Sequence, residues 1–492
     1  MSDWITTCNE SPNWLSREEP ESEAPRWSLT ILWSGAQPER IGETAFVTNS
    51  NEERVLGRGD ATPQDPAERV KFVRQRPGRL GATEPLAGEG LSRKQCLVKS
   101  AGTGISIRNC GRAPMLVDGV ETASAIVREA QIVSIRDQLL LYCTRIAPLP
   151  KLRYFDGTQS MAFGMADKHG IVGEHRSAWD LRDRLAFAAQ SDQHVLLLGE
   201  SGSGKELAAR AVHQLSRRAA EPLVARNAAT FPSTLIDAEL FGNAANYPNA
   251  GMPARSGLIG QCDGSSLFLD EIAELPMDLQ AHLLRVLDRG GEYQRLGDSQ
   301  IRQSHFRLIA ATNRDPTDLR LDFFGRLTLH VQLPALVDRV TDIPLLVRHL
   351  LLRAAQSTTA LWDRFFVETE QGPQPRIEPD LVESLVRHRY TYNIRELDGL
   401  LWKAIADSPR NFIRLTKPVR ESLVPVVALQ QAEPVAEPSA EQLVQALERN
   451  GHNVARTAES LQLSSRYALY RLLRKHGIAV ERAQDPARER RE

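Results

Sequence analysis

The sequence predicts a multidomain protein in which a β-sandwich precedes an α/β region with a helical lid, and a small all-α module follows. Three patterns support this order. Short β-rich stretches separated by Gly, Pro and Asp come first, strand-like apolar runs then alternate with helical patterns, and amphipathic helical periodicity returns near the C-terminus. The length of 492 residues also exceeds what one hydrophobic core serves, so several domains are expected.

The β-sandwich is predicted from four β-forming stretches, 27–33, 105–108, 132–135 and 139–144, with turn residues between them. The segment before them is polar, acidic and contains Pro, which is typical of a disordered tail. The full division that we expect is a tail at 1–25, the β-sandwich at 26–147, a linker at 148–170, the α/β subdomain at 171–334, the helical lid at 335–410, a linker at 411–438, a helix-turn-helix domain at 439–480 and a charged tail at 481–492.

The composition indicates a water-soluble protein, with 41% hydrophobic and 25% charged residues and no apolar run near the roughly 20 residues that span a bilayer. The N-terminus lacks the basic start and apolar core of a secretory signal, so a cytoplasmic location is expected. The five cysteines are scattered without a CxxC pair, which argues against a disulfide framework or a zinc site. With 61 basic and 62 acidic side chains, any contact with DNA must come from a local basic patch.

A glycine-rich loop at 199–205 lies between a buried-strand pattern, VLLL, and a helix-forming run, ELAARAVHQL. Its glycines let backbone N–H groups close around phosphate oxygens, the helix N-terminus adds positive potential, and Lys205 supplies a cation for the β and γ phosphates. This context predicts a nucleotide-binding loop, with a fortuitous Gly-rich turn as the alternative. The expected cofactor-binding residues are Gly199, Glu200, Ser201, Gly202, Ser203, Gly204, Lys205 and Glu206.

Two further strand patterns end in polar residues. SLFLDE ends in Asp270 and Glu271, which we expect to hold Mg²⁺ and to polarise the attacking water, respectively. Another strand ends in Thr312 and Asn313, polar groups suited to sensing the γ-phosphate of ATP. A solvated acidic strand end and a Thr-Asn turn are the alternatives for each pattern alone. Together with the glycine-rich loop, however, the patterns favour binding of ATP and Mg²⁺ with hydrolysis of ATP.

Over about residues 171–407, and again at the C-terminus, the sequence resembles the bacterial enhancer-binding proteins that activate sigma-54 RNA polymerase. The segments that carry the resemblance are IVGE, GESGSGKE, ELFG, SLFLDEI, ATNRD and YTYNIREL. The resemblance implies an AAA+ P-loop ATPase fold with a helical lid. It also makes Glu206 the usual residue after the lysine of the phosphate loop.

The same resemblance gives roles to four further residues. Asn227 is placed as the asparagine that switches the catalytic glutamate, and Arg395 as the sensor arginine of the lid. Arg320 and Arg326 fall where the family has arginines that reach a neighbouring subunit's nucleotide and stabilise charge on the transferred phosphoryl group. Arginines that act across an interface imply a ring, in this family usually a hexamer. Solvated surface arginines are the alternative.

One loop departs from the family. Residues 243–256, between Gly242 and Gly257, have the usual length, but the GAFTGA motif that grips the sigma factor is replaced by Asn-Tyr-Pro-Asn-Ala-Gly at 246–251. Pro248 and Asn249 stand in place of the Phe-Thr pair, and Tyr247 offers an aromatic side chain one position away. Direct contact with sigma-54 is therefore an open question.

The C-terminal pattern predicts two helices, at 439–449 and 453–460, and a third, basic one that ends at Lys475. It resembles the Fis-type helix-turn-helix, which implies binding to double-stranded DNA. A helical dimerisation hairpin with a solvated basic face is the alternative. The side chains expected to face the major groove or the phosphates are Ser465, Arg466, Tyr467, Arg471, Arg474 and Lys475.

The N-terminal module resembles the forkhead-associated (FHA) fold, a β-sandwich whose loops read phosphothreonine, through LGR, LSRKQ and LVDG. The resemblance implies that Arg58 pairs with phosphate and that Ser92 donates a hydrogen bond, with Arg93 in the same loop. Three departures stand out. Gln95 replaces the family's His, the loop expected at 59–90 is unusually long, and the asparagine that reads the peptide backbone is absent near Ala113.

These patterns favour a transcriptional regulator with an FHA-like input domain, an ATP-hydrolysing AAA+ ring and a DNA-binding domain. Its expected partners are double-stranded DNA, RNA polymerase holoenzyme of the sigma-54 type, a phosphothreonine protein and further copies of itself. A second hypothesis is a DNA-binding regulator that uses nucleotide as an assembly switch and acts independently of sigma-54, as the altered loop favours. A third, a nucleotide-driven remodeller unconnected with transcription, is disfavoured by the C-terminal domain.

Overall fold

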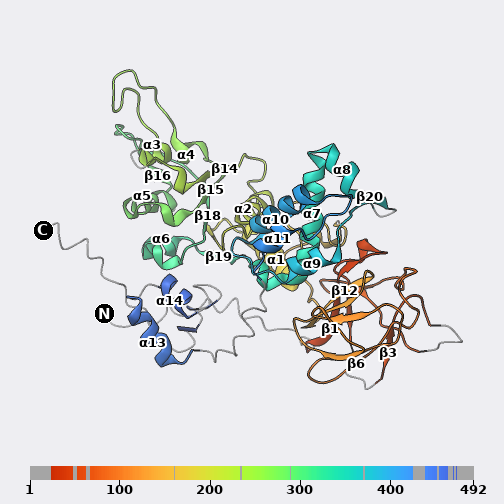
Figure 1. Cartoon of the computed structure of the whole chain (residues 1–492). Coiled ribbons are helices and arrows are strands. Elements are labelled where there is room, and N and C mark those ends of the chain that lie inside the picture. Colours follow the sequence, from red (N-terminus) through yellow and green to blue (C-terminus); the bar gives the residue numbers. More distant parts are fainter. Residues whose placement is uncertain are drawn as a thin grey trace. The chain divides into compact units, whose positions relative to one another are not determined.

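The structure is a computed structural model that describes residues 24–47, 52–61, 67–159, 161–232, 235–288, 290–369, 372–424, 438–451, 454–461, 463, 469 and 472–473. It forms two compact units, residues 1–423 and 424–492. Each unit is described by itself below (Figure 1). Among the described residues, no helix has the length and apolar character needed to cross a membrane.

The N-terminal part of the first unit is built from two antiparallel β-sheets, which agrees with the β-rich region predicted there. The larger sheet has the strand order β5-β4-β2-β1-β12-β11-β8-β9 and the smaller one β10-β7-β6-β3. Their strands are β1 (Arg26–Ser34), β2 (Thr44–Phe46), β3 (Arg54–Leu56), β4 (Val73–Arg76), β5 (Arg79–Ala82), β6 (Cys96–Ser100), β7 (Ile105–Asn109), β8 (Met115–Val117), β9 (Val120–Glu121), β10 (Ser124–Val127), β11 (Ile132–Ile135) and β12 (Leu139–Ile146).

Apolar side chains from both sheets form the core of this β-sandwich. Leu29 and Ile31 of β1 and Ile105 and Ile107 of β7 are fully buried in one cluster, as expected for strands whose alternate residues face inward. The hairpin of β4 and β5 lies within residues 59–90, which the sequence predicts to be a long loop. That prediction is wrong for the two strands. This hairpin extends the larger sheet and carries Arg74 and Arg76.

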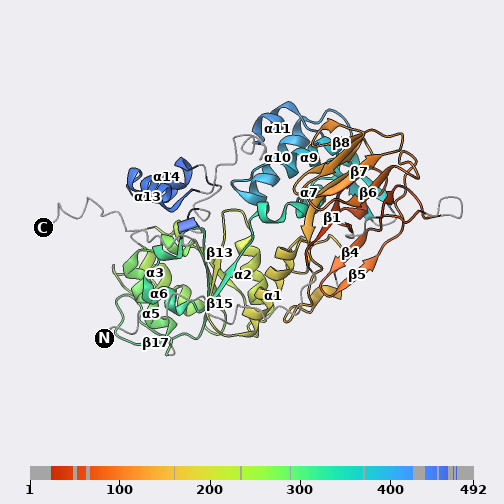
Figure 2. The ribbon, with the colours of Figure 1, turned by 90° about the horizontal axis from the view of Figure 1, so that it is seen from below.

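The α/β part is a parallel sheet with the strand order β14-β15-β18-β13-β19. One face packs on helices α1 and α2 and the other on α3 to α6 (Figure 2). The strands are β13 (Val195–Leu198), β14 (Val224–Asn227), β15 (Ser266–Asp270), β18 (Arg307–Thr312) and β19 (Leu329–Gln332), with a hairpin of β16 (Glu292–Tyr293) and β17 (Arg302–Gln303). The helices are α1 (Arg176–Gln190), α2 (Lys205–Gln214), α3 (Ile236–Phe241), α4 (Gly257–Gln261), α5 (Met277–Leu287) and α6 (Leu321–Arg326), with 3-10 turns η4 (Ala228–Thr230), η5 (Ile272–Glu274) and η6 (Pro316–Asp318).

The burial pattern of the strands explains the two covered faces. In β13, Leu196 faces the cluster of α3 to α6, whereas Val195 and Leu197 face the cluster of α1 and α2. All three side chains are fully buried. A strand that is apolar on both faces is typical of a parallel sheet between two helical layers.

A helical region follows the sheet. Its elements are η7 (Leu336–Asp342), α7 (Ile343–Gln356), α8 (Thr359–Phe365), α9 (Pro379–Val386), α10 (Asn393–Asp407) and α11 (Lys417–Ser422), with a hairpin of β20 (Phe366–Thr369) and β21 (Gly372–Pro375). Val419 of α11 is fully buried in the core of this lid. The lid therefore continues past residue 410, its predicted end, into the segment predicted as a linker.

The segment between the β-sandwich and α1 packs closely against α1. A carboxylate oxygen of Asp183 accepts hydrogen bonds from the backbone N–H groups of Arg153, Tyr154 and Phe155, at 2.8–3.0 Å. The Phe155 ring also packs against Trp179. These contacts attach the segment to the α/β part.

In the second unit, α13 (Ala440–Arg449) and α14 (Val454–Ser460) are the helices that the structure bounds. Ser439 caps α13 in a capping box with Gln442, the signal that defines a helix start. Leu443 and Leu447 are buried with Leu469 and Leu472. The positions of both helices agree with the periodicity of the sequence.

Candidate functional site

Parallel pairing brings the carboxyl ends of four strands to one edge of the sheet. Asn227 at the end of β14 pairs in register with Asp270 at the end of β15, and Leu198 at the end of β13 pairs with Thr312 at the end of β18. Because β15 and β18 are also neighbours, the phosphate loop that follows Leu198 opens at the same edge as Asp270 and Thr312. This edge is where parallel sheets bind ligands.

The phosphate loop is shaped by two glycines with left-handed backbone, Gly202 (φ 74°) and Gly204 (φ 100°). A Cβ atom on Gly204 would meet no heavy atom within 4 Å, so the space in front of the N-terminus of α2 is open. Lys205, the first residue of α2, is 7% exposed, and its Nζ donates to the carbonyl oxygens of Gly199 (3.1 Å) and Glu200 (3.3 Å). A glycine loop, a helix N-terminus and a lysine together form an anion-binding site.

The acidic pair lies close enough to Lys205 to affect its protonation. Burial lowers the pKa of Lys205, while the charges of Glu271 and Asp270 act to raise it. Glu271 has a left-handed backbone (φ 52°), and its N–H donates to Asp270 Oδ1 at 2.9 Å. Strained backbone of this kind is enriched at functional sites.

The donor set at this edge fits Mg²⁺ bound together with phosphates. No group of three or more His, Cys, Asp or Glu side chains with metal-site geometry occurs among the described residues. Mg²⁺ is usually held by one or two carboxylates together with phosphate oxygens and water. The Asp270 carboxylate beside the phosphate loop matches that pattern.

The remaining polar groups at the strand ends are held by local hydrogen bonds. Asn227 Oδ1 accepts from the N–H of Ala229 at 2.8 Å, and Thr312 Oγ1 accepts from the N–H of Arg314 at 3.0 Å. Thr312 is fully buried, and its carbonyl oxygen accepts from Gly199 N at 3.3 Å. Asn313 follows directly, at the mouth of the same edge.

The lid supplies one predicted residue to the phosphate loop, because Arg395 Nη1 donates to Ser201 Oγ at 3.3 Å. Three other predicted side chains form exposed ion pairs within the chain. Glu206 pairs with Arg210, Arg320 with Asp322 and Arg326 with Asp288. Exposed ion pairs of this type are weak, so they present little obstacle to an arginine that changes partner.

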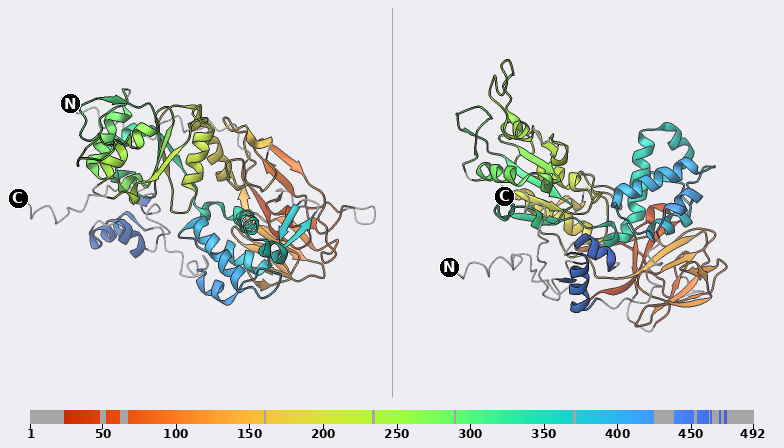
Figure 3. Two further views of the ribbon diagram at one scale, coloured as in Figure 1. Left: turned by 90° about the horizontal axis from the view of Figure 1, so that it is seen from above. Right: turned by 60° about the vertical axis from the view of Figure 1, so that its left-hand side comes forward.

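The loop at 243–256 projects from the α/β part between α3 and α4 (Figures 1 and 3). Its base is fixed by Asn243, which is 3% exposed and whose Nδ2 lies within 3.3 Å of the carbonyl oxygens of Ala244, Tyr247 and Pro253. The Tyr247 ring packs against Gly297 of the β16–β17 hairpin, where an added Cβ would lie 2.3 Å from the ring. The aromatic side chain that the sequence offered for a partner therefore rests with one side on this hairpin, while Tyr247 remains 40% exposed.

The three residues proposed to bind phosphate lie on adjacent loops of the β-sandwich. Arg58 N donates to the carbonyl oxygen of Ser92 at 3.1 Å, and both arginines, Arg58 and Arg93, are exposed. Ser92 Oγ accepts from the N–H of Arg112 at 3.1 Å. The fully buried Gln95, which stands in place of the family's His, braces these loops because its amide accepts from Ser92 N and donates to Ala113 O.

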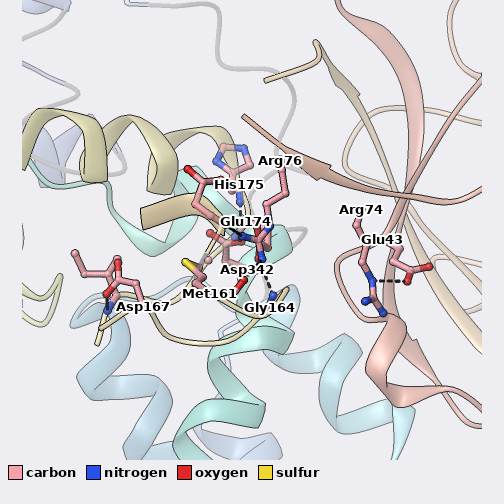
Figure 4. A network of polar contacts seen from close by, with 12 residues as sticks. Glu43, Arg74, Arg76, Met161, Gly164, Asp167, Glu174, His175 and Asp342 are labelled. Atoms are coloured by element: carbon pink, nitrogen blue, oxygen red, sulfur yellow. Dashed lines mark hydrogen bonds and ion pairs between the residues drawn. The ribbon is translucent and has the colours of Figure 1, made fainter. Parts of the chain in front are cut away.

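A polar network joins the β-sandwich to the α/β part (Figure 4). Arg76 of β4 donates to the carbonyl oxygens of Thr158 and Met161 and lies 3.4 Å from Glu174 Oε1, which also accepts from Gly164 N. Burial raises the pKa of Glu174 to about 7, although Arg76 opposes that shift. The backbone N–H of Glu174 donates to Asp342 Oδ1, at the end of η7.

The β-sandwich also contacts the lid. Trp33 Nε1 donates to the carbonyl oxygen of Ile377 at 3.0 Å, and Arg387, directly after α9, pairs with Asp118 at 2.6 Å. Leu32 and Leu140 are buried in the same cluster as the lid helices. The sandwich therefore contacts both parts that flank the phosphate loop.

The predicted DNA-contacting residues lie outside the described residues. They are Ser465, Arg466, Tyr467, Arg471, Arg474 and Lys475.

The sequence did not single out three residues with structural contacts around this region: Asn393, whose Nδ2 donates to Glu200 Oε2 in the phosphate loop at 3.0 Å, and the ion pair of Glu174 and Arg76 between the α/β part and the β-sandwich. Asn393 stands in the YTYNIREL motif, but no role followed from the motif alone. Glu174 belongs to the IVGE motif, yet its raised pKa comes from burial in the folded protein, and its ion-pair partner Arg76 lies far away in the sequence. Arg76 carried no signal, because its segment was expected to be a loop.

Comparisons with known proteins agree with this geometry. Residues 171–336 match the sigma-54 interaction domain. The formate hydrogenlyase transcriptional activator of Salmonella typhimurium (strain SL1344) is 35% identical over 279 residues, which cover 55% of this chain and 38% of that protein. The chain thus spans well under half of the length of that relative.

Other relatives are covered more fully. The Nif-specific regulatory protein of Azotobacter vinelandii is 33% identical over 61% of this chain and 58% of its own length. The crystal structure of NtrX from Brucella abortus in complex with ATP is similar with a TM-score of 0.43 at 30% identity, covering 62% of this chain and 69% of that one. The transcriptional regulatory protein ZraR of Escherichia coli (strain K12) is 32% identical over 63% of this chain and 69% of its own length. Together with the domain match, this extent of similarity shows that the chain belongs to the family of transcriptional regulators with a sigma-54 interaction domain.

Proposed function

We propose that this protein is an ATP-dependent transcriptional regulator that binds DNA upstream of a promoter and uses ATP hydrolysis to remodel sigma-54 RNA polymerase holoenzyme. The observation that carries the proposal is the sheet edge at which the phosphate loop, the acidic pair and the polar end of β18 meet. Such an edge can bind a nucleotide and position a water molecule. Membership in the family supports the link to transcription.

Each residue at the edge has a role in this proposal. Lys205 and the loop N–H groups bind the phosphates, and Asp270 holds Mg²⁺, which neutralises charge on the phosphate oxygens. Glu271 polarises the attacking water, and Asn227, one strand away, controls the orientation of that glutamate. Thr312, Asn313 and Arg395 sense the phosphates from the strand end and from the lid.

Hydrolysis in this scheme takes place in a ring. Arg320 and Arg326 leave their exposed carboxylate partners and reach the nucleotide of the neighbouring subunit, where their charge stabilises the transferred phosphoryl group. A homo-hexamer is the proposed assembly, in the cytoplasm, where the C-terminal helix-turn-helix module contacts double-stranded DNA. The basic residues proposed for that contact are the ones named from the sequence.

The β-sandwich is proposed to be an FHA-like input domain that binds a phosphothreonine segment at Arg58, Ser92 and Arg93. Two exposed arginines beside a hydroxyl suit a dianionic phosphate. Binding of a threonine-phosphorylated peptide library, compared with its unphosphorylated form, tests the proposal. Equal binding of both forms, or binding by Arg58→Ala as strong as that of the wild type, would contradict it.

A second candidate function is specifically favoured by the loop at 243–256. Pro248 and Asn249 stand at its tip, and the Tyr247 ring is packed against Gly297. A loop without the family's apolar tip suits a DNA-binding regulator that uses nucleotide as an assembly switch and acts independently of sigma-54. The nucleotide-binding residues are common to both candidates, so the candidates differ in what bound nucleotide does, which is to drive remodelling of sigma-54 holoenzyme in the first and to switch assembly in the second.

Open-complex formation on a sigma-54 promoter, measured with ATP, decides between the candidates. The wild type is expected to stimulate it, and Lys205→Ala and Asp270→Asn are expected to abolish both stimulation and ATP turnover. Lys417→Ala, at a lysine whose side chain is 87% exposed, is the matched control. ATP turnover by the wild type without any stimulation would refute the sigma-54 assignment and leave the second candidate.

A further inference from the structure

Asn393, the first residue of α10, has an unusual environment for an asparagine. It is 1% exposed and adopts a left-handed backbone with φ 49°, a conformation that costs free energy in residues other than glycine unless local contacts stabilise it. The preceding turn is held in place by Glu396, whose Oε2 accepts hydrogen bonds from the N–H groups of Thr391 (2.7 Å) and Tyr392 (2.9 Å).

The side-chain amide of Asn393 connects three parts of the motor. Its Nδ2 donates to Glu200 Oε2 at 3.0 Å and to the carbonyl oxygen of Ser201 at 3.1 Å, both in the phosphate loop. Its Oδ1 accepts from Leu336 N at 2.7 Å, at the start of η7, where the chain passes from the sheet to the lid. Both amide hydrogens and the amide oxygen of Asn393 are thus used. They connect the lid to the phosphate loop and to the start of η7, where the sheet leads into the lid.

The backbone reinforces these contacts. Ile394 N donates to the carbonyl oxygen of Gly202 at 3.2 Å. A Cβ atom on Gly202 would lie only 2.1 Å from the carbonyl oxygen of Tyr392, so the turn before α10 packs directly on the phosphate loop. Arg395, two residues after Asn393, reaches Ser201 Oγ from this position.

We propose that Asn393 is a positioning residue for ATP turnover, which fixes the lid and its arginine against the phosphate loop. The proposal rests on the ATP hydrolysis proposed above and adds a residue to which no role was assigned. Asn393 acts through the loop and through Arg395. Its loss allows the N-terminus of α10 to move relative to the phosphate loop, and misplacement of a positioned group by about 1 Å can slow chemistry on the order of a hundredfold.

The substitutions separate the amide from the backbone geometry. Asn393→Gly keeps the left-handed backbone at low cost but removes the amide. Asn393→Asp keeps the shape and the acceptor for Leu336 N, but it loses both donors and places a second carboxylate beside Glu200. In Asn393→Asp with Glu200→Gln, the new glutamine can donate to the new aspartate, so the hydrogen bond is restored with its polarity reversed.

We expect kcat/KM for ATP to fall about tenfold or more in Asn393→Gly and in Asn393→Asp, the change typical of losing a hydrogen bond to a charged group. The double variant is expected to recover part of the loss relative to Asn393→Asp, with Glu200→Gln alone as the reference. Asn411→Gly, at an exposed position of the lid, is the matched control. All assays use the full chain at temperatures where thermal melts show each variant folded.

The outcomes are distinct. A wild type that does not hydrolyse ATP overturns the proposed function, and the affinity for ADP then tests Asn393, with weaker binding expected in Asn393→Gly. Unchanged kcat, KM and ADP affinity in Asn393→Gly overturn the inference even if its melting temperature falls, because a merely structural role moves stability alone. Absence of any recovery in the double variant overturns the assigned contact with Glu200.

Discussion

Glu174 shows how burial sets the properties of a single side chain. Its side chain is 6% exposed, with Arg76 as its ion-pair partner, and burial raises its pKa to about 7 from the ordinary value of 4.5. Arg182 also lowers the pKa and Asp342 raises it. A carboxyl group with a pKa near 7 changes its charge around neutral pH, so its interactions change within the physiological range.

The pKa of Glu174 predicts a pH dependence of stability. Because the folded-state pKa lies above the unfolded one, the folded protein binds the proton more tightly, and the free energy of unfolding falls as pH rises from about 4.5 to 7. The loss is on the order of 3 kcal/mol. Denaturant unfolding between pH 5 and 8 should therefore show a shallower pH slope in Glu174→Gln than in the wild type. Equal slopes would show that Glu174 does not take up a proton in this range.

At the scale of an element, the loop at 243–256 depends on one buried amide. Asn243→Ala leaves three carbonyl oxygens without their common donor, at a cost of about 1–3 kcal/mol for each group that stays buried. We expect faster amide hydrogen exchange throughout 244–255 and unchanged ATP turnover in this variant. Asn249→Ala, at an exposed position of the same loop, should exchange like the wild type. Unchanged exchange in Asn243→Ala would contradict this account of the loop base.

The sequence predicted those elements whose signal is local. The phosphate loop between β13 and α2 and the carboxylates at the end of β15 were predicted because strand, glycine and helix patterns follow one another within a short stretch of chain. Parallel strands then required their ends to meet at one edge. The roles of Asn243 and Gly297 were not predictable, because the contact between their two loops depends on tertiary packing.

The same limit applies to the lid and the β-sandwich. Asn393 contacts Glu200 across almost two hundred positions of sequence. The β4–β5 hairpin has few apolar residues, and its segment looked like a loop because Arg74, Gln75 and Arg76 interrupt any alternating pattern. Its strand pairing with β2 becomes visible only in the folded sheet.

At the scale of the whole first unit, one ion pair and its neighbours join the β-sandwich, the α/β part and η7, which leads into the lid. Arg76 comes from the sandwich, Glu174 from the α/β part, and Asp342, which accepts from Glu174 N, from the end of η7 (Figure 4). Trp33 and Arg387 add contacts between the sandwich and the lid. A displacement of the sandwich would therefore affect both sides of the nucleotide site.

This arrangement predicts the outcome of a double-mutant cycle. Arg76→Met should lower the free energy of unfolding by roughly 3 kcal/mol at pH 8, at the lower end of the range for breaking a buried pair, because it leaves a buried carboxylate without its cation. The cost should be smaller at pH 5, where Glu174 is protonated in both proteins. Arg76→Met combined with Glu174→Gln should recover the electrostatic part. Additive effects of the two substitutions at pH 8 would show that the pair is not coupled.

The base of the loop at 243–256 is fixed mainly by bonds to backbone atoms. Asn243 donates to carbonyl groups, Ala244 N bonds to Leu296 O, and Leu296 N bonds to Gly242 O. Such bonds place few demands on the identity of the side chains at the tip. The tip residues are therefore free to diverge while the phosphate loop and the acidic pair stay constant, so substitution at a few surface positions can change what this loop contacts without altering the residues at the sheet edge.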